Sequence, residues 1–582
     1  MSHSTIPLLT PSALRAALAA RRELAVLDVR EEGVSARRRL FYSSIAPVGR
    51  LGLVVGRLVP RLDTPVVLVD EAGEYAPRAA ARLARFGYTD VSILEGGVSG
   101  WEAAGFEVFS GTNVPGKAFG EVIEHRLDTP NIDALTLKRL QDAGEDVVVL
   151  DSRPFSEYRT MNIPGGAECA GAELVYRALA AAPSPDTLIV VNCAGRTRSI
   201  LGAQSLVNAG IPNPVAALTG GSMSWLLAGL ELERGQIRTA PRPDGATLAS
   251  ARELARRAAA RAGVIEIDRA TLARFEREAA THTLYRFDVR DPLEYEAGHR
   301  AGWRSAPGGQ LVQATDEYVG TLHARVVLAD DDGVRARMTA SWLVQLGYLQ
   351  VFVLGGDDPS AAFEAGPQPQ AILRAPGRTP WIEADQLAQA LEAGRAQVVD
   401  VDSSLAFRRA HVAGARFVAA SALEDWLEQI DDPSRQLVLT SGDGVLAGLL
   451  ADELNAGLQA GLEAGLNAGS NAGLGAGEQA GLHARRPGVA ALLGGTQRWL
   501  ALGLPQAAGD DGNLTGDDDA WYSPYHYAPG QAARQMQAYL AWELQLVGQL
   551  ERDGIASIDV IDFDTPTDGR SSERLAALRR AD

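Results

Sequence analysis

One pattern of apolar and polar positions recurs four times along the chain. Each copy opens with a short apolar run that ends in Asp, as expected for a buried strand followed by a polar turn. These opening runs lie at 25–30, 147–153, 284–290 and 397–402. A second apolar run and then a helical stretch follow in every copy, and the second runs lie at 65–70, 188–193, 325–330 and 437–441. Such a repeat predicts one supersecondary unit per copy.

Each copy closes with a short strand and a pair of glycines, at 96–97, 220–221, 355–356 and 494–495. Three copies place a Trp shortly after the second glycine: Trp101, Trp225 and Trp499. Apolar strands that alternate with helices predict a parallel sheet covered on both faces. We therefore expect an α/β protein of tandem modules, each a small parallel sheet flanked by helices. The strand-to-helix turns should gather at the carboxyl edge of each sheet.

The repeats set the expected domain boundaries. Modules one to four are expected at 5–112, 120–236, 263–366 and 380–508. The Pro- and Gly-containing stretch 238–245 is typical of a linker, and 247–262 is predicted to be a connecting helix.

Two segments do not belong to the repeat. Module four contains an Ala-Gly-Leu repeat at 455–482, which we interpret as a mobile insertion; an interaction helix is the alternative. The tail at 509–582 begins acidic, becomes aromatic at 521–527 and continues as a predicted helix at 530–553. Its apolar positions are Met536, Leu540, Leu544, Val547 and Leu550. We expect this helix to pack on the modules, with a partner-docking helix as the alternative.

Composition narrows the function classes. The chain has 73 acidic and 55 basic residues and a formal net charge of −18, which disfavours nucleic-acid partners. Neither a secretory signal nor an apolar run of membrane-spanning length is found. Two cysteines argue against a disulfide framework and fit a reducing compartment, so a cytoplasmic location is expected. The eight histidines are scattered, and we expect neither a metal site nor a cofactor.

The chemistry concentrates in the loop that follows the second strand of module two. Cys193 ends an apolar strand, and a helix begins a few residues later. Backbone N–H groups of the loop and the helix N-terminus are then expected to point at the sulfur. Arg196 and Arg198 add positive charge, and Gly195 allows the backbone to curl around the sulfur. Each feature favours the thiolate, which is the nucleophilic form of cysteine.

The loop Cys-Ala-Gly-Arg-Thr-Arg-Ser at 193–199 resembles the active-site loop of rhodanese-family sulfurtransferases. Other stretches of module two match the family framework: Asp151 and Arg153, Glu157-Tyr158, 163–166 and 219–221. The resemblance covers nearly all of 5–508 as four modules, but only module two matches the catalytic loop. Met161-Asn162 departs from the Gly-His usual in the family.

The resemblance implies a two-step sulfur relay. Cys193 would take the outer sulfur of thiosulfate or a similar small anionic donor as a persulfide, and cyanide or a thiol would then accept it. Asp151 and Arg153 would be framework residues. The residues implied to bind the sulfur donor are Ala194, Gly195, Arg196, Thr197, Arg198 and Ser199.

Several alternatives stay open. The protein could deliver persulfide sulfur to a protein acceptor, or serve as a binding array with a vestigial or inert Cys193. A phosphatase of the Cys-x5-Arg type would need Arg at position 199, where this chain has Ser199. Cys169 could be a second thiol that accepts the sulfur, or a small buried residue.

The other modules lack the nucleophile. The residues aligned with Cys193 are Asp70, Asp330 and Ser441. Asp and Ser at this position are expected to cap the following helix, so these modules are expected to be non-catalytic. Metal binding by the acidic loop 330–333 is the alternative.

Overall fold

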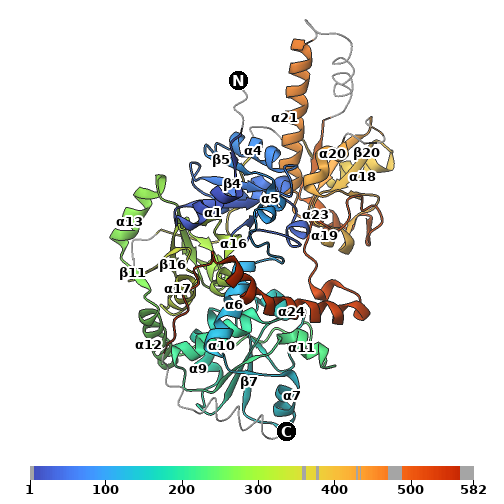
Figure 1. Cartoon of the computed structure of the whole chain (residues 1–582). Helices are drawn as coiled ribbons and strands as arrows, with labels where there is room; N and C mark the ends of the chain where they lie inside the picture. Colours follow the sequence, from blue (N-terminus) through green and yellow to red (C-terminus); the bar gives the residue numbers. More distant parts are fainter. Residues whose placement is uncertain are drawn as a thin grey trace.

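The computed structural model describes residues 6–356, 362–374, 379–427, 430, 432, 434–468 and 488–563. Each of the four repeats contains a parallel sheet of five strands. Figure 1 shows helices beside these sheets. In chain order, the strands of every module are arranged 1-5-4-2-3. The predicted class, tandem parallel sheets flanked by helices, is therefore confirmed.

The first two modules follow one another through a long buried helix. Module one comprises β1 (Leu8–Leu9), α1 (Pro11–Ala19), β2 (Leu24–Asp28), α2 (Glu32–Ser35), β3 (Ser44–Ile45), α3 (Leu51–Leu58), β4 (Val66–Val69), α4 (Ala76–Arg85), β5 (Val91–Leu94) and α5 (Gly97–Ala103). Helix α6 (Val114–Leu127) leads to module two, which comprises β6 (Asn131–Ile132), α7 (Ala134–Ala143), β7 (Val147–Asp151), α8 (Phe155–Thr160), β8 (Ala167–Glu168), α9 (Glu173–Ala181), β9 (Leu188–Asn192), α10 (Thr197–Ala209), β10 (Val215–Leu218) and α11 (Gly221–Leu227).

Module three begins after the connecting helix α12 (Gly245–Arg261). Its elements are β11 (Ile265–Ile267), α13 (Arg269–Arg277), β12 (Leu284–Asp288), α14 (Pro292–Ala297), β13 (His299–Arg300), β14 (Arg304–Ser305), α15 (Gly308–Gln313), α16 (Thr315–Tyr318), β15 (Thr321–Leu322), β16 (Arg325–Ala329), α17 (Arg335–Leu346), β17 (Gln350–Leu354) and β18 (Phe363–Glu364). Strand β15 pairs antiparallel with β2, so module three extends the sheet of module one.

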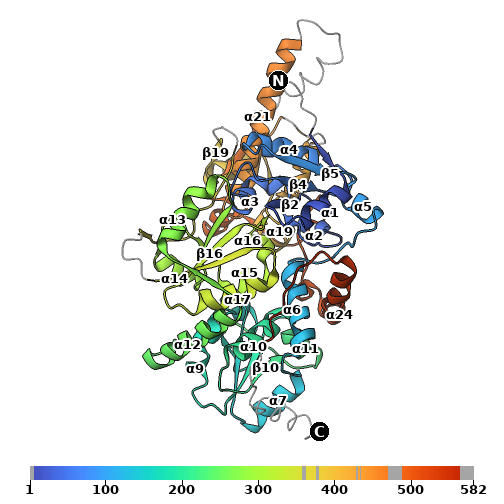
Figure 2. The ribbon, with the colours of Figure 1, turned by 60° about the vertical axis from the view of Figure 1, so that its left-hand side comes forward.

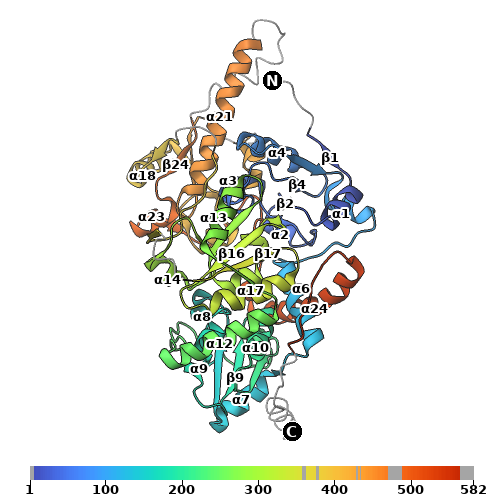
Figure 3. The same cartoon turned by 90° about the vertical axis from the view of Figure 1, so that its left-hand side faces the viewer.

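Module four and the tail complete the described chain. Their elements are β19 (Trp381–Ile382), α18 (Ala384–Glu392), β20 (Ala396–Asp400), α19 (Ser404–Arg409), β21 (His411–Val412), β22 (Arg416–Phe417), α20 (Leu423–Leu427), β23 (Gln436–Thr440), α21 (Val445–Ala468), β24 (Ala490–Leu492), α23 (Gly495–Ala501), β25 (Gln506–Ala507) and α24 (Pro529–Asp553). Helix α21 projects from the body of the molecule in all three views (Figures 1, 2 and 3) and includes the start of the Ala-Gly-Leu repeat. The repeat residues 469–482 lie outside the described residues.

The tail helix α24 packs on the modules, as expected. It lies beside α6 between module one and module two (Figures 2 and 3). Its buried apolar residues are Met536, Leu546 and Leu550. The expected apolar stripe is wrong at Leu544, which is 58% exposed. The buried face of α24 runs through Met536, Glu543, Leu546 and Leu550, and Leu544 lies on another side of the helix.

A buried ion pair ties the end of β7 to the following loop, and the equivalent strands β2 and β12 carry the same pair. In module two, Arg153 donates to both carboxylate oxygens of Asp151, at 2.8 and 2.6 Å, and to the carbonyl of Met161 at 2.6 Å. The same bidentate geometry joins Arg30 to Asp28 and Arg290 to Asp288. Such a pair holds the carboxyl edge of the sheet in one geometry. This edge carries the loop of Cys193.

Candidate active site

Cys193 directly follows the fully buried strand β9, which lies between β7 and β10 in its sheet. The turn is fixed from outside by the N-terminus of α11, where the N–H groups of Ser222 and Met223 donate to the carbonyls of Cys193 and Ala194, at 2.9 and 3.1 Å. Gly221 makes this approach possible: its φ is +54°, and a Cβ there would lie 2.3 Å from the Cys193 carbonyl oxygen. The paired glycines of the repeat therefore serve to dock α11 against the loop.

Module one shows what the backbone of this turn can bind. Asp70 stands where module two has Cys193, at the end of the equivalent strand. Its carboxylate accepts the N–H groups of Gly73, Tyr75 and Ala76, at 2.7, 2.8 and 2.8 Å. The N–H groups three, five and six residues after the strand end thus converge on one negatively charged side chain.

Modules three and four use N–H groups at equivalent positions of the turn. Asp330 accepts from Gly333 at 2.9 Å and from Ala336 at 3.0 Å, and Ser441 accepts from Ala447 at 3.2 Å. Asp70, Asp330 and Ser441 therefore cap the following helices, as the sequence analysis expected. Their own side chains occupy the N–H groups of the turn.

In module two the equivalent N–H groups belong to Arg196, Arg198 and Ser199. The Cys193 thiol donates to the Ser199 hydroxyl at 3.5 Å, and the Ser199 N–H also bonds to the sulfur. These donors lie at the start of α10, where N–H groups have no partner inside the helix and the helix dipole is positive. The side chain of Cys193 thus occupies the anion position of the turn.

Arg198 is the cation whose charge acts on Cys193. Its guanidinium binds the Glu157 carboxylate through two nitrogens, at 2.7 and 2.9 Å, and reaches Gln310 of module three at 3.2 Å. Its positive charge favours the Cys193 thiolate. The pair with Glu157 holds the guanidinium in place beside the loop.

Arg196 points away from this arrangement. Its guanidinium binds Glu121 through two nitrogens, at 2.8 and 2.9 Å, and also contacts Glu124, so that it is tied to α6. The structure therefore brings Arg198, but not Arg196, into the electrostatic surroundings of Cys193. Binding of a sulfur donor by both arginines stays a prediction.

The tail covers the loop, a feature that sequence reasoning did not assign to the site. Cys193 is 2% exposed. A Cβ on Gly195 would lie 3.1 Å from the Tyr539 ring and 3.2 Å from the Glu543 carboxylate, both on α24. Tyr525, before α24, donates to the Ala194 carbonyl at 3.2 Å. The aromatic run at 521–527 was the only sequence signal of this contact.

Comparison with known proteins identifies the family of the chain. A family model described as "Rhodanese-like domain" matches residues 10–104, 133–228 and 383–501, which together make up more than half of the chain. The chain belongs to the rhodanese family. None of the three matched ranges lies in module three, although the sheet of module three has the same strand order as those of the other modules.

A solved structure has the same arrangement of modules. Thiosulfate sulfurtransferase from Pseudomonas aeruginosa is 44% identical, and the match covers 96% of this chain and 100% of that one with a TM-score of 0.86. Thiosulfate sulfurtransferase from Gallus gallus is 34% identical over 122 residues, or 20% of this chain. The chain spans only 39% of the length of the chicken protein.

Burial controls the protonation of the rhodanese thiol. Burial raises the pKa of Cys193, whereas the charge of Arg198 and hydrogen bonding with Ser199 lower it. The Glu543 carboxylate raises the pKa of Cys193 further through its negative charge. Arg198 and Ser199 thus favour the thiolate, as expected, but desolvation is the largest contribution and raises the pKa of the covered thiol.

Glu543 belongs to a buried cluster beneath the tail. It is 1% exposed, and one oxygen accepts from Tyr539 at 3.1 Å and from Thr197 at 3.4 Å. The other carboxylate oxygen has no hydrogen-bond partner among the described residues. Lys117 of α6 is buried nearby, and its ammonium lies 5.1 to 5.3 Å from the ring centroids of Trp521, Tyr539 and Trp542. Burial raises the pKa of Glu543 and lowers that of Lys117.

Replacement of Glu543 by Gln is expected to lower the pKa of Cys193, because the change removes a negative charge and keeps an oxygen to accept from Thr197 and Tyr539. Alkylation of Cys193 by iodoacetamide, followed by peptide mass spectrometry from about pH 6 to 10, should show a midpoint at lower pH. Glu551→Gln is the control, because it removes the same charge from an exposed position of α24. An unchanged midpoint in Glu543→Gln would contradict the electrostatic role.

Cys169 lies in a different environment. It is fully buried in the apolar core of module two, and its N–H donates to the Asp151 carbonyl at 2.8 Å. Burial raises the pKa of its thiol well above the usual value, and its charged neighbours are Glu168, Arg177 and Glu173. None of these is among the groups that act most strongly on Cys193. This environment fits the interpretation of Cys169 as a small buried residue.

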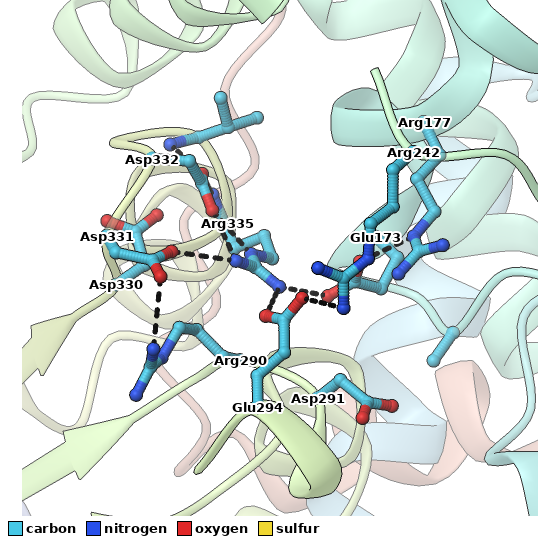
Figure 4. A network of polar contacts seen from close by, with 12 residues as sticks. Glu173, Arg177, Arg242, Arg290, Asp291, Glu294, Asp330, Asp331, Asp332 and Arg335 are labelled. Carbon is cyan, nitrogen blue, oxygen red and sulfur yellow. Dashed lines mark hydrogen bonds and ion pairs between the residues drawn. The ribbon is translucent and has the colours of Figure 1, made fainter. Parts of the chain in front are cut away.

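The acidic loop of module three is tied up in ion pairs (Figure 4). Arg335, the counterpart of Arg198, contacts Glu294 at 2.5 Å, Glu173 of module two at 2.8 Å and Asp331 at 3.0 Å. It also contacts Asp332 at 2.5 Å. The loop therefore fixes module three against module two. In the part of the chain that the structure describes, no three His, Cys, Asp or Glu side chains are placed to hold a metal ion.

Proposed function

We propose that this rhodanese is a thiosulfate sulfurtransferase in which Cys193 carries the transferred sulfur as a persulfide. The observation that carries the proposal is the turn after β9, where the Cys193 thiol stands in place of the Asp70 carboxylate of module one and hydrogen-bonds with Ser199 at the start of α10. The relative from P. aeruginosa, whose name states thiosulfate sulfurtransferase, supports it.

The first half-reaction loads the enzyme. The Cys193 thiolate attacks the outer sulfur of thiosulfate, the sulfur–sulfur bond of thiosulfate breaks, and sulfite leaves with the bonding electron pair. The N–H groups of Arg196, Arg198 and Ser199 stabilise the terminal persulfide anion, as the equivalent N–H groups of module one stabilise the Asp70 carboxylate. Arg198 favours the approach of the anionic sulfur donor.

The second half-reaction discharges the persulfide. Cyanide or a thiol attacks the outer sulfur, and the bond to Cys193 breaks and returns the thiolate, so that ping-pong kinetics are expected. The cover formed by Tyr539 and Glu543 must move aside for either substrate, because Cys193 is 2% exposed. The modules at 5–112, 263–366 and 380–508 take no part in the chemistry and position module two.

The test is the formation of thiocyanate from thiosulfate and cyanide by the full chain, together with the mass of the Cys193 peptide after thiosulfate alone. We expect thiocyanate and a gain of one sulfur atom on that peptide. Persulfide without thiocyanate would favour the alternative, a relay that delivers sulfur to a protein acceptor. Absence of both would overturn thiosulfate as the sulfur donor.

The surroundings of the reaction follow from the same chain. No helix among the described residues is long and apolar enough to cross a membrane. Because Cys193 and Cys169 are both free thiols, we place the protein in the cytoplasm, where the thiolate is kept reduced. We propose no cofactor, metal or nucleic-acid partner.

A further inference from the structure

A cavity lies between module one and module three, away from the loop of Cys193. Helix α3 forms one wall, β12 and β14 form another, and the segment 368–371 forms the third. Its volume is about 520 Å³, within the range of small-molecule sites. Hydrogen bonds fix the third wall: Leu373 N–H donates to Gly52 at 2.9 Å, and Gln368 accepts from Ser305 N–H at 2.9 Å.

The walls carry a strong excess of positive charge. Four arginines line the cavity, and none of its lining residues is Asp or Glu: the arginines are Arg50, Arg57, Arg286 and Arg304. This composition is the reverse of the whole chain, whose net charge is −18. A concave site lined by one sign of charge concentrates ligands of the opposite sign.

Arg304 is an arginine of this cavity that has no carboxylate among the groups that act most strongly on it. Its guanidinium donates to the carbonyls of Arg57 at 2.7 Å and Tyr318 at 3.5 Å and lies 5.1 Å from the Phe287 ring centroid. Among the described residues, its buried Nε has no hydrogen-bond partner. Burial lowers the pKa of Arg304 to about 10, and the groups that act most strongly on it include Tyr285 and Arg57 but no carboxylate. A partly buried cation without a carboxylate is costly, and a bound anion would offset that cost.

The remaining arginines leave donors for a ligand. Arg286 contacts Glu276 at 2.6 Å through one nitrogen, and Arg50 donates to the Asp402 carbonyl. The Arg57 side chain is exposed. Apolar side chains complete the walls, and they include Leu53, Val54, Pro60 and Leu284.

We propose that this cleft binds an organic anion that carries phosphate groups. Arginine forks match phosphate oxygens through paired hydrogen bonds. The apolar walls and a volume well above that of one phosphate group provide room for an organic part. The site is separate from Cys193 and does not rest on the proposed reaction.

The test is isothermal titration calorimetry of the full chain with ADP and with inorganic pyrophosphate. We expect saturable ADP binding that weakens at least about tenfold in Arg57→Gln and in Arg304→Met. Arg256→Gln is the matched control, since it removes one arginine charge from an exposed position of α12, where Arg256 is 59% exposed. Arg57→Gln keeps the test valid if Arg304→Met fails to fold, because Arg57 is exposed.

Three results would overturn the proposal. No saturable heat with either probe would exclude a phosphate site. Equal weakening by Arg256→Gln would show a general charge effect. Binding of pyrophosphate but not of ADP would show that the organic part is not accommodated.

Discussion

Cys193→Ser is expected to abolish thiocyanate formation from thiosulfate and cyanide, with a loss of at least about a thousandfold. A serine hydroxyl in this position has no activating base: the side chain faces N–H donors and Arg198, which stabilise an anion but do not take up a proton. A hydroxyl also cannot form a persulfide. The change is nearly isosteric, so the thermal unfolding temperature should change little. The initial rates of the wild type and the variant are compared at equal concentration.

Cys169→Ser is the matched control for this prediction. Cys169 lies in the apolar core, and its charged neighbours are not among the groups that act most strongly on Cys193, so we expect this variant to keep most of its activity while losing some stability. Equal loss in both variants, with Cys169→Ser still folded, would favour a relay through two thiols. Activity retained in Cys193→Ser would contradict the proposed nucleophile.

Arg198→Met is expected to lower kcat/KM for thiosulfate by about 100- to 1,000-fold. The change removes the positive charge that favours the Cys193 thiolate and leaves the Glu157 carboxylate without its partner beside the site. Both effects also raise the pKa of Cys193, so the pH at which alkylation of Cys193 reaches half its maximum should rise.

Arg196→Met tests whether the second arginine shares this role. Its guanidinium is held by Glu121 and Glu124 of α6, so we expect a smaller loss of kcat/KM and no shift in the pH profile of Cys193 alkylation. Its N–H group, which belongs to the turn, is kept in the variant. Equal losses in both variants would show that Arg196 turns toward the sulfur donor during the reaction.

The sequence by itself determined the repeats, and it predicted Cys193 as the candidate nucleophile and three modules without a cysteine at that position. Apolar strands, polar turns and paired glycines are local patterns that can be read from the sequence. Gly221, for example, has a positive φ and lies close to the Cys193 carbonyl, where a side chain would not fit. The caps at Asp70 and Asp330 also follow from local rules, because the donors lie within six residues of the acceptor.

Only the tertiary structure decided what surrounds the loop. Glu543 lies 350 positions after Cys193 in the sequence, and no local pattern links the two. The same holds for Lys117 among the tail aromatics and for Arg304 opposite α3. The direction of Arg196 depended on the acidic face of α6, which the loop motif does not encode.

The physical reason is the range of the interactions. Hydrogen bonds of a turn and the alternation of apolar residues are fixed by neighbours in the chain, so the sequence of module two determined the loop geometry. The pKa of Cys193 depends on desolvation and on charges brought from α24, which come from elements far apart in the chain. The sequence by itself thus predicted Cys193 as the candidate nucleophile, and only the packing of the tail decided how far the thiol is covered and how readily it ionises.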